Sequence, residues 1–134
     1  MDIMKSNHAV HSIAYHIVFC TKYRHKVLVG SVEVDTKRII GQICKHYNWK
    51  LKSLEIMPDH VHIFLQTDHT IAPFRIAQII KSISAVYIFT KYPELKGQKF
   101  WGSGLWSPST YYGTVGHISE ETVQKYIESQ KLKS

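Results

Sequence analysis

The chain has 134 residues, 44% of them hydrophobic, which suffices for one domain with its own core. Seventeen Lys and Arg residues against ten Asp and Glu residues give a net charge of +7 and a pI near 9.4, which favours a polyanionic partner, nucleic acid before an anionic membrane surface. The longest apolar stretch, residues 82–90, is far shorter than the roughly 20 residues of a membrane span, and the first ten residues lack the apolar segment of a secretory signal.

The predicted domain spans residues 1–134, with residues 1–10 as a flexible tail, in a cytoplasmic protein. Residues 11–21 alternate β-branched and aromatic side chains and predict a strand. Residues 35–47 predict a helix with Ile39, Ile40, Ile43 and Tyr47 on its apolar stripe. Cys20 and Cys44 lack metal-ligand spacing and are expected to be reduced thiols.

Two strands are predicted next, at residues 50–57 and from His60 onward, joined by a turn at Pro58-Asp59. Side chains two apart on a strand point to the same face. His60 and His62 therefore project together, and the apolar residues that alternate with them project toward a core. Two imidazoles side by side on a rigid strand make half of a metal site.

Residues 73–90 predict a second helix that ends at Tyr92-Pro93. Its apolar positions at helical spacing are Ile76, Ile79, Ile80, Ile83 and Tyr87. A Gly-rich loop at 96–108 and a last strand at 109–115 follow. The order β-α-β-β-α-β predicts an α+β protein with the ferredoxin-like, or RRM-like, split βαβ fold: an antiparallel sheet with both helices on one face.

A C-terminal helix is predicted after Ser119 as N-cap. Val123, Tyr126, Ile127 and Gln130 share one stripe of it. Packing alone explains such a stripe, but a second interpretation makes Tyr126 a nucleophile and Gln130 a metal ligand. Two His nitrogens and one amide oxygen would leave open positions on Mg²⁺ or Mn²⁺ for a scissile phosphate. Attack by a tyrosine would conserve the phosphodiester energy in a phosphotyrosine bond.

Six segments of the chain resemble the HUH-motif single-tyrosine transposases of bacterial and archaeal insertion sequences, including the REP-associated tyrosine transposases. They are residues 15–24 (YHIVFCTKYR), 57–63 (MPDHVHI), 100–101 (FW), 105–109 (LWSPS), 111–116 (YYGTVG) and the helix carrying Tyr126 and Gln130. The resemblance implies a transposase that cleaves and rejoins single-stranded DNA through a 5′-phosphotyrosine, with His60, His62 and Gln130 as ligands. It also implies recognition of DNA hairpins, and a homodimer with shared active sites.

Basic residues predict the DNA contacts. Lys22, Tyr23, Arg24 and Lys26 combine cationic groups with an aromatic ring, which suits phosphate contact and base stacking. Arg38 and Lys81 extend this set on the two helices. Trp101 and Trp106 could stack on unpaired bases or pack the loop that contains them.

Three other functions remain open from the residues. A non-catalytic RRM-like nucleic-acid-binding module would expose aromatic residues on the open sheet face, with Tyr15 and Phe19 as candidates. A replication- or relaxase-type HUH nickase would share the chemistry, but 134 residues are not expected to include the appended helicase domain of such a protein. A zinc hydrolase would need a carboxylate beside the histidine pair, for which Asp59 is the candidate.

Overall fold

The computed structural model describes residues 13–67, 71–100, 102–114 and 120–133. The predicted tail at 1–10, Trp101, the proposed N-cap Ser119 and the side chain of Val123 lie outside the described parts. In chain order the elements are β1 (Ile13–Cys20), the 3₁₀ turn η1 (Lys22–Arg24), α2 (Gly30–His46), β2 (Lys50–Met57), β3 (His60–Thr67), α3 (Pro73–Lys91), α4 (Pro93–Gln98), β4 (Tyr111–Thr114) and α5 (Glu120–Lys133).

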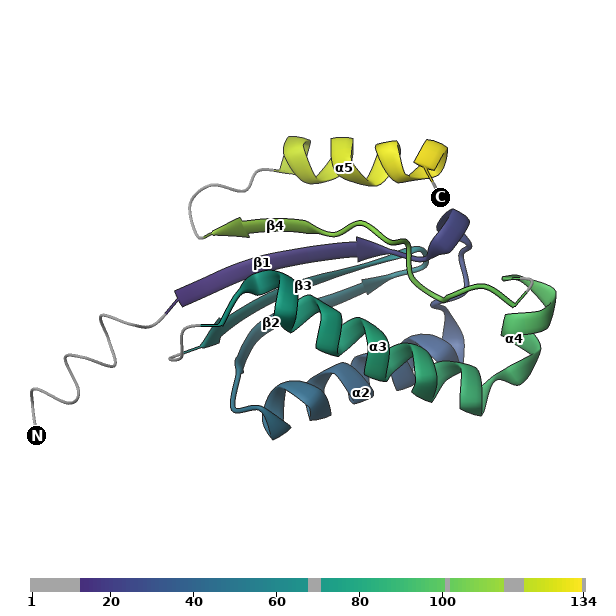
Figure 1. Ribbon diagram of the computed structural model, residues 1–134, viewed down its shortest axis with the longest axis horizontal. Helices are drawn as coiled ribbons and strands as arrows, with labels where there is room; N and C mark the ends of the chain where they lie inside the picture. Colours follow the sequence, from purple (N-terminus) through teal and green to yellow (C-terminus); the bar gives the residue numbers. More distant parts are fainter. Residues whose placement is uncertain (1–12, 68–70, 101, 115–119, 134) are drawn as a thin grey trace, which may run out of the picture.

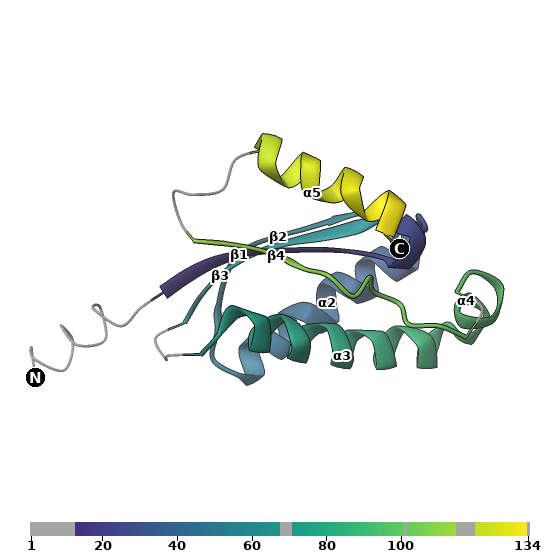
Figure 2. The same cartoon turned by 45° about the horizontal axis from the view of Figure 1, so that its top comes forward.

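The four strands form one antiparallel sheet in the order β2-β3-β1-β4. β3 lies between β1 and β2, so the first βαβ unit is split, and the predicted ferredoxin-like topology is confirmed. Helices α2 and α3 cover one face of the sheet, and α5 lies over the opposite face (Figure 1). The turned view in Figure 2 shows the same three layers.

Alternation along the central strands builds these two faces. On β3, Val61, Ile63 and Leu65 are fully buried in the core under α2 and α3, as predicted. His60 and His62 are half-buried on the other face. β1 follows the same rule: Ile17 and Phe19 belong to the main core, whereas Val18 and Cys20 pack against Ile127 of α5. The same rule keeps the paired histidines out of the main core.

The helices depart from the predictions in three places. α2 begins at Gly30, five residues before the predicted start at residue 35, because Gly30 accommodates a φ of 58° and Val32 adds a buried turn. Tyr47 is 39% exposed, so it does not belong to the core stripe. A short helix, α4, occupies the beginning of the predicted Gly-rich loop.

The buried stripe of α3 is also rotated from the predicted one. Ser84 and Ile88 are fully buried, whereas Ile83 is 39% exposed and Tyr87 is half-buried. Ser84 is buried because its hydroxyl accepts a hydrogen bond from the indole nitrogen of Trp106, at 3.0 Å. A polar side chain with a satisfied hydrogen bond can replace an apolar residue in a core, which hydrophobic periodicity does not detect.

Candidate active site on the open face of the sheet

His60 and His62 each direct one ring nitrogen toward a carboxylate. Nδ1 of His60 lies 2.9 Å from Oδ1 of Asp59, and Nδ1 of His62 lies 3.8 Å from Oε1 of Glu55 on the neighbouring strand. The His60 and His62 side chains are 18% and 27% exposed, so both reach solvent. A histidine whose Nδ1 donates to a carboxylate keeps Nε2 free to bind a cation, the arrangement common at metal sites in proteins.

Asp59 is a buried carboxylate, 5% exposed, at the turn between β2 and β3. Its Oδ2 accepts two hydrogen bonds from Arg24, from Nε at 2.9 Å and from a terminal nitrogen at 2.8 Å. Burial by itself would raise the pKa of Asp59, but the hydrogen bonds from His60 and Arg24 outweigh it and lower the pKa. Because both oxygens of Asp59 are engaged by side chains, this arrangement does not supply the direct ligand that a zinc hydrolase would need.

His16 is a third imidazole on this face and was not among the predicted site residues. Its Nδ1 lies 3.1 Å from Nε2 of His62, and its ring stacks on Phe64 with centroids 4.4 Å apart. Burial, with a smaller effect from His62, lowers the pKa of His16. Alternation along β1 could have placed it here, because it shares a face with Val18 and Cys20.

Tyr126 lies on the same face of the sheet, packed against Val18 and Cys20, which are the cross-strand neighbours of His62 and His60. Its hydroxyl donates to the backbone carbonyl of Ser109 at 3.0 Å, and its ring packs near Tyr111. Burial raises the pKa of Tyr126 to about 12, although the side-chain hydroxyl of Ser109, 3.5 Å from the phenol oxygen, partly offsets this. Within the described residues, Tyr126 makes no hydrogen bond or ring contact with His60 or His62.

Gln130 is 2% exposed and is held by two serines. Its amide oxygen accepts from the hydroxyls of Ser107, at 2.7 Å, and Ser109, at 2.6 Å. The structure therefore brings His60 and His62 together but engages the amide oxygen of Gln130 elsewhere. No group of three or more His, Cys, Asp or Glu side chains in the described part of the chain could hold a metal ion. Two imidazole nitrogens do fit a divalent cation that keeps open positions.

The predicted DNA-contacting residues fall into separate places. Lys22, Tyr23, Arg24 and Lys26 lie in or beside η1, next to α5. Tyr23 is 40% exposed there, whereas the Arg24 guanidinium is bonded to Asp59. Arg38 lies on α2, across the sheet from α5, where it hydrogen-bonds Asp35 and Tyr87.

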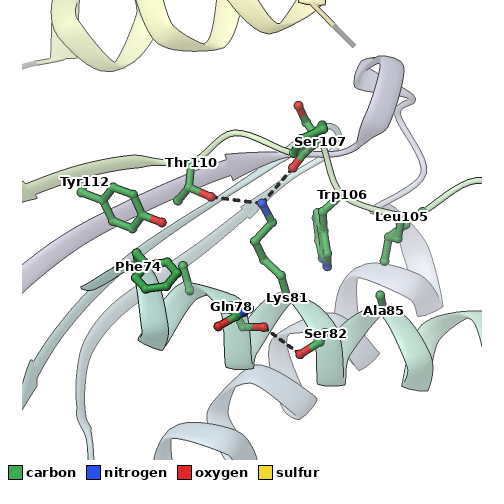
Figure 3. Close-up of a pocket in the computed structure, with 13 residues that line it drawn as sticks. Phe74, Gln78, Lys81, Ser82, Ala85, Leu105, Trp106, Ser107, Thr110 and Tyr112 are labelled. Atoms are coloured by element: carbon green, nitrogen blue, oxygen red, sulfur yellow. Dashed lines mark hydrogen bonds between the residues drawn. The ribbon is translucent and has the colours of Figure 1, made fainter. Parts of the chain in front are cut away.

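Lys81 lies on α3 and lines a cleft of about 460 Å³ between α3 and the segment leading into β4. Its ammonium group donates to the carbonyl of Ser107 at 2.8 Å and to the hydroxyl of Thr110 at 3.0 Å (Figure 3). Burial lowers the pKa of Lys81 to about 8. Trp106 lies beside it, only 7% exposed and in edge contact with Phe19, so this tryptophan packs the core and does not present a base-stacking surface.

Tyr15 and Phe19, the stacking residues of the RRM-like alternative, are buried in the main core at 8% and 0% exposure. They are not available to unpaired bases. Across the described residues, no helix combines the length and the apolar character needed to cross a membrane.

Comparison with known proteins identifies close relatives over nearly the whole chain. The ISDra2 transposase TnpA of Deinococcus radiodurans is 38% identical over 130 residues, which cover 97% of this chain and 92% of the relative. The transposase for insertion sequence element IS200 of Salmonella typhimurium is 27% identical over 116 residues, covering 87% and 75%.

Solved structures agree with these sequence matches. A crystal structure from Deinococcus radiodurans, described as a candidate transposase, superimposes with a TM-score of 0.78 at 38% identity and covers 89% of this chain and 91% of that one. A REP-associated tyrosine transposase bound to a REP hairpin has a TM-score of 0.56 at 12% identity, covering 87% and 62%, and so shares the fold. The family model for IS200-like transposases matches residues 9–130. The chain therefore belongs to the IS200-like transposase family and is a DNA transposase by that membership.

Proposed function

We propose that this transposase cleaves and rejoins single-stranded DNA at the ends of an insertion sequence, with Tyr126 as the nucleophile beside a cation site at His60 and His62. The paired histidines carry the proposal. Nδ1 of His60 lies within hydrogen-bond distance of Asp59, and Nδ1 of His62 faces Glu55 at 3.8 Å. Both side chains are partly open to solvent, and α5, which carries Tyr126, lies over the same sheet face. Two imidazoles and a nearby phenol on one face are compatible with metal-assisted phosphoryl chemistry.

His60 and His62 would hold Mg²⁺ or Mn²⁺ through Nε2, with the amide oxygen of Gln130 as a third ligand. The bound cation would polarise the scissile phosphate and neutralise its charge. Imidazole ligands favour Mn²⁺ somewhat over Mg²⁺. Gln130 would first have to release the hydroxyls of Ser107 and Ser109, which now occupy its oxygen, and Nε2 of His62 would have to leave Nδ1 of His16, which lies 3.1 Å away.

Tyr126 would attack the phosphorus atom and lose its phenolic proton. The new O–P bond would link the 5′-phosphate of the DNA to the tyrosine, and the broken P–O bond would leave a 3′-hydroxyl. With a pKa of about 12, the docked phenol is neutral at physiological pH. The hydroxyl would therefore have to leave the Ser109 carbonyl and be activated at the cation site.

We further propose a homodimer in which Tyr126 of one subunit serves the histidine pair of the other. In support, Tyr126 makes no hydrogen bond or ring contact with either histidine within the described residues of its own chain, and its hydroxyl is bonded to Ser109 instead. The DNA partner would be single-stranded with hairpin ends, as in the REP-associated transposase whose structure contains a hairpin. Lys22, Tyr23 and Lys26, with Arg38 and Lys81 on the helices, are the proposed contacts, supported by the net charge of +7.

The test is incubation of the protein with labelled single-stranded element ends and Mg²⁺ or Mn²⁺. We expect a denaturant-resistant protein–DNA adduct that disappears with EDTA and in Tyr126→Phe, which should still bind the hairpin. Tyr111→Phe is the matched control, because it removes a hydroxyl from the ring that packs beside Tyr126. A normal adduct in Tyr126→Phe would show that another group is the nucleophile.

A further inference from the structure

Each oxygen of the Asp59 carboxylate has its own partner. Oδ1 lies 2.9 Å from Nδ1 of His60, and Oδ2 receives both the Nε and the terminal nitrogen of Arg24. Because Asp59 is 5% exposed, water has little access to replace either partner. The guanidinium thus fixes the carboxylate, and the carboxylate fixes which nitrogen of His60 carries the proton.

The backbone conformation of Tyr23 and Arg24 directs the Arg24 side chain toward Asp59. Tyr23 and Arg24 both adopt positive φ angles, 60° and 52°, which residues with side chains seldom do. Thr21, at the start of this turn, is fully buried and fixes the turn through two hydrogen bonds. Its backbone nitrogen donates to the Asp59 carbonyl at 3.0 Å, and its hydroxyl donates to the carbonyl of His25, at the end of the turn, at 2.7 Å. Two consecutive strained residues held in this way indicate a constrained position.

The same guanidinium also reaches the helix that carries the tyrosine. A terminal nitrogen of Arg24 donates to the backbone carbonyl of Ile127 at 3.4 Å. Ile127 directly follows Tyr126 and is buried against Val18 and Cys20. In Figures 1 and 2 the C-terminal half of α5 ends beside η1, the turn that contains Arg24.

We propose that Arg24 is a positioning residue of the transposase rather than a DNA contact. It holds Asp59 on Nδ1 of His60 and ties that pair to the position of α5. The inference deepens the proposed function, since it depends on His60 binding the cation through Nε2. Without Arg24, Oδ2 of the buried carboxylate would lose its donors, the carboxylate would turn toward water, and His60 would lose its fixed orientation.

The test compares Arg24→Gln with Lys26→Gln, which removes the same charge from an exposed neighbour that makes no contact with Asp59. We expect Arg24→Gln to weaken Mn²⁺ binding, measured by titration calorimetry without DNA, by roughly 10–100-fold. Lys26→Gln should bind Mn²⁺ like the wild type. ¹⁵N NMR of the metal-free protein should show His60 protonated at Nδ1 in the wild type and as a mixture of tautomers in Arg24→Gln.

Arg24→Lys covers the case in which Arg24→Gln does not fold. It keeps the charge but cannot reach Asp59 with two nitrogens and Ile127 with a third. Its Mn²⁺ affinity should fall between those of the wild type and Arg24→Gln, and amide exchange at residues 124–130 should accelerate. The affinity of Arg24→Lys for the DNA hairpin, measured in EDTA, should be at least as high as that of Lys26→Gln.

An unchanged His60 tautomer and unchanged Mn²⁺ affinity in the folded Arg24 variants would overturn the proposal. A loss of hairpin affinity with no change in the tautomer would make Arg24 a DNA contact instead. The NMR measurement needs no metal, so it is independent of the cation site. If His60→Ala binds Mn²⁺ like the wild type, the proposed cation site is wrong, whatever Arg24 does to the tautomer.

Discussion

The two histidines of β3 have carboxylate partners of unequal strength. Asp59 is buried and lies within hydrogen-bond distance of His60. The Glu55 side chain is 72% exposed and lies 3.8 Å from His62, beyond a hydrogen bond. Exposed ion pairs contribute little because water screens them, whereas a buried charge-assisted hydrogen bond orients its partner. His60 is therefore the more firmly oriented of the two.

Replacing each carboxylate by its amide should separate the contribution of the buried Asp59 from that of the exposed Glu55. Asp59→Asn should weaken Mn²⁺ binding by about 10–100-fold, the usual consequence of losing a residue that orients a metal ligand. Glu55→Gln should change it by less than about fivefold, corresponding to at most ~1 kcal/mol for an exposed pair. Calorimetric titration of both purified variants measures the difference. Equal losses would mean that burial of the carboxylate does not decide its effect.

Lys81 allows a prediction about alkaline pH. Its pKa of about 8 lies below the ordinary value of 10.5, because burial disfavours the charged form. Between pH 8 and pH 10.5, Lys81 is protonated in the unfolded chain but largely neutral in the folded chain, so the free energy of unfolding rises with pH in this range. The stability of the wild type relative to Lys81→Met should therefore increase between pH 7 and pH 10. Urea unfolding at both pH values checks this; a constant difference would contradict the lowered pKa.

Helix α5 is attached to the sheet through a small polar contact as well as through Ile127. Gln130 accepts the two hydroxyls of Ser107 and Ser109 in a buried position. Removing the Gln130 amide oxygen leaves the Ser107 and Ser109 hydroxyls without their acceptor, which costs roughly 1–3 kcal/mol of folding free energy. The position of Tyr126 depends on this contact, because the same serine, Ser109, accepts the phenol.

Gln130→Leu should therefore loosen α5 on the sheet. We expect faster amide exchange at residues 124–130, with the protection of β1 and β3 unchanged. Gln124→Leu is the matched control on the same helix, because Gln124 is exposed and bonds only Glu128 within the described residues. Equal exchange in the two variants would mean that the serine contacts do not hold the helix.

Asp35 joins the two helices on the opposite face. It accepts hydrogen bonds from Lys91 and Tyr92 at the end of α3, and from Arg38 on α2. The hydrogen bond from Lys91, followed by that from Tyr92, lowers the pKa of Asp35 from 3.8 to about 2. Its stabilising effect is present above pH 3.8 and is lost as the pH falls toward 2.

Asp35→Asn should accordingly lower the melting temperature at pH 6. The gap between wild type and variant should narrow as the pH falls below 4 and nearly close at pH 2. Thermal unfolding followed by circular dichroism across this range measures the gap. A gap independent of pH would show that the carboxylate charge is not what joins α2 to α3.

The elements differ in how far the sequence predicted them. Strand β2, the start of β3 and the start of α3 were predicted to the residue, because alternation, the Pro58-Asp59 turn and Pro73 mark them. Sequence could not supply contacts between distant segments. The hydrogen bond from Trp106 to Ser84 accounts for a buried polar residue on α3 that hydrophobic periodicity does not predict. Arg24 was predicted to contact DNA and Gln130 to bind a metal, but in the structure they bond to Asp59 and Ser107.

The two faces of the sheet carry different sets of the predicted functional residues. The histidine pair lies on the sheet face that α5, with Tyr126, covers, whereas Arg38 on α2 and Lys81 on α3 belong to the helices that cover the other face. Tyr126 makes no hydrogen bond or ring contact with the histidines of its own chain in the described residues, so the proposed dimer, in which Tyr126 of one subunit serves the histidine pair of the other, remains to be tested.

Mixing two inactive variants tests the shared site. Tyr126→Phe retains the histidines, and His62→Ala retains the tyrosine. In a mixed dimer with shared sites, one site is complete, so random subunit exchange should restore roughly a quarter of the wild-type adduct. If each chain uses its own tyrosine, the mixture should stay inactive, provided that subunit exchange is verified by differently tagged chains.

The most direct measurement is to digest the covalent adduct and locate the bound nucleotide by mass spectrometry. A tyrosine that attacks a phosphate beside His60 and His62 predicts the nucleotide phosphate on Tyr126 of the wild type in Mn²⁺, and no adduct in His62→Ala. A nucleotide on Tyr111, Tyr112 or any other residue, or an adduct that forms equally well without the histidine, would contradict it.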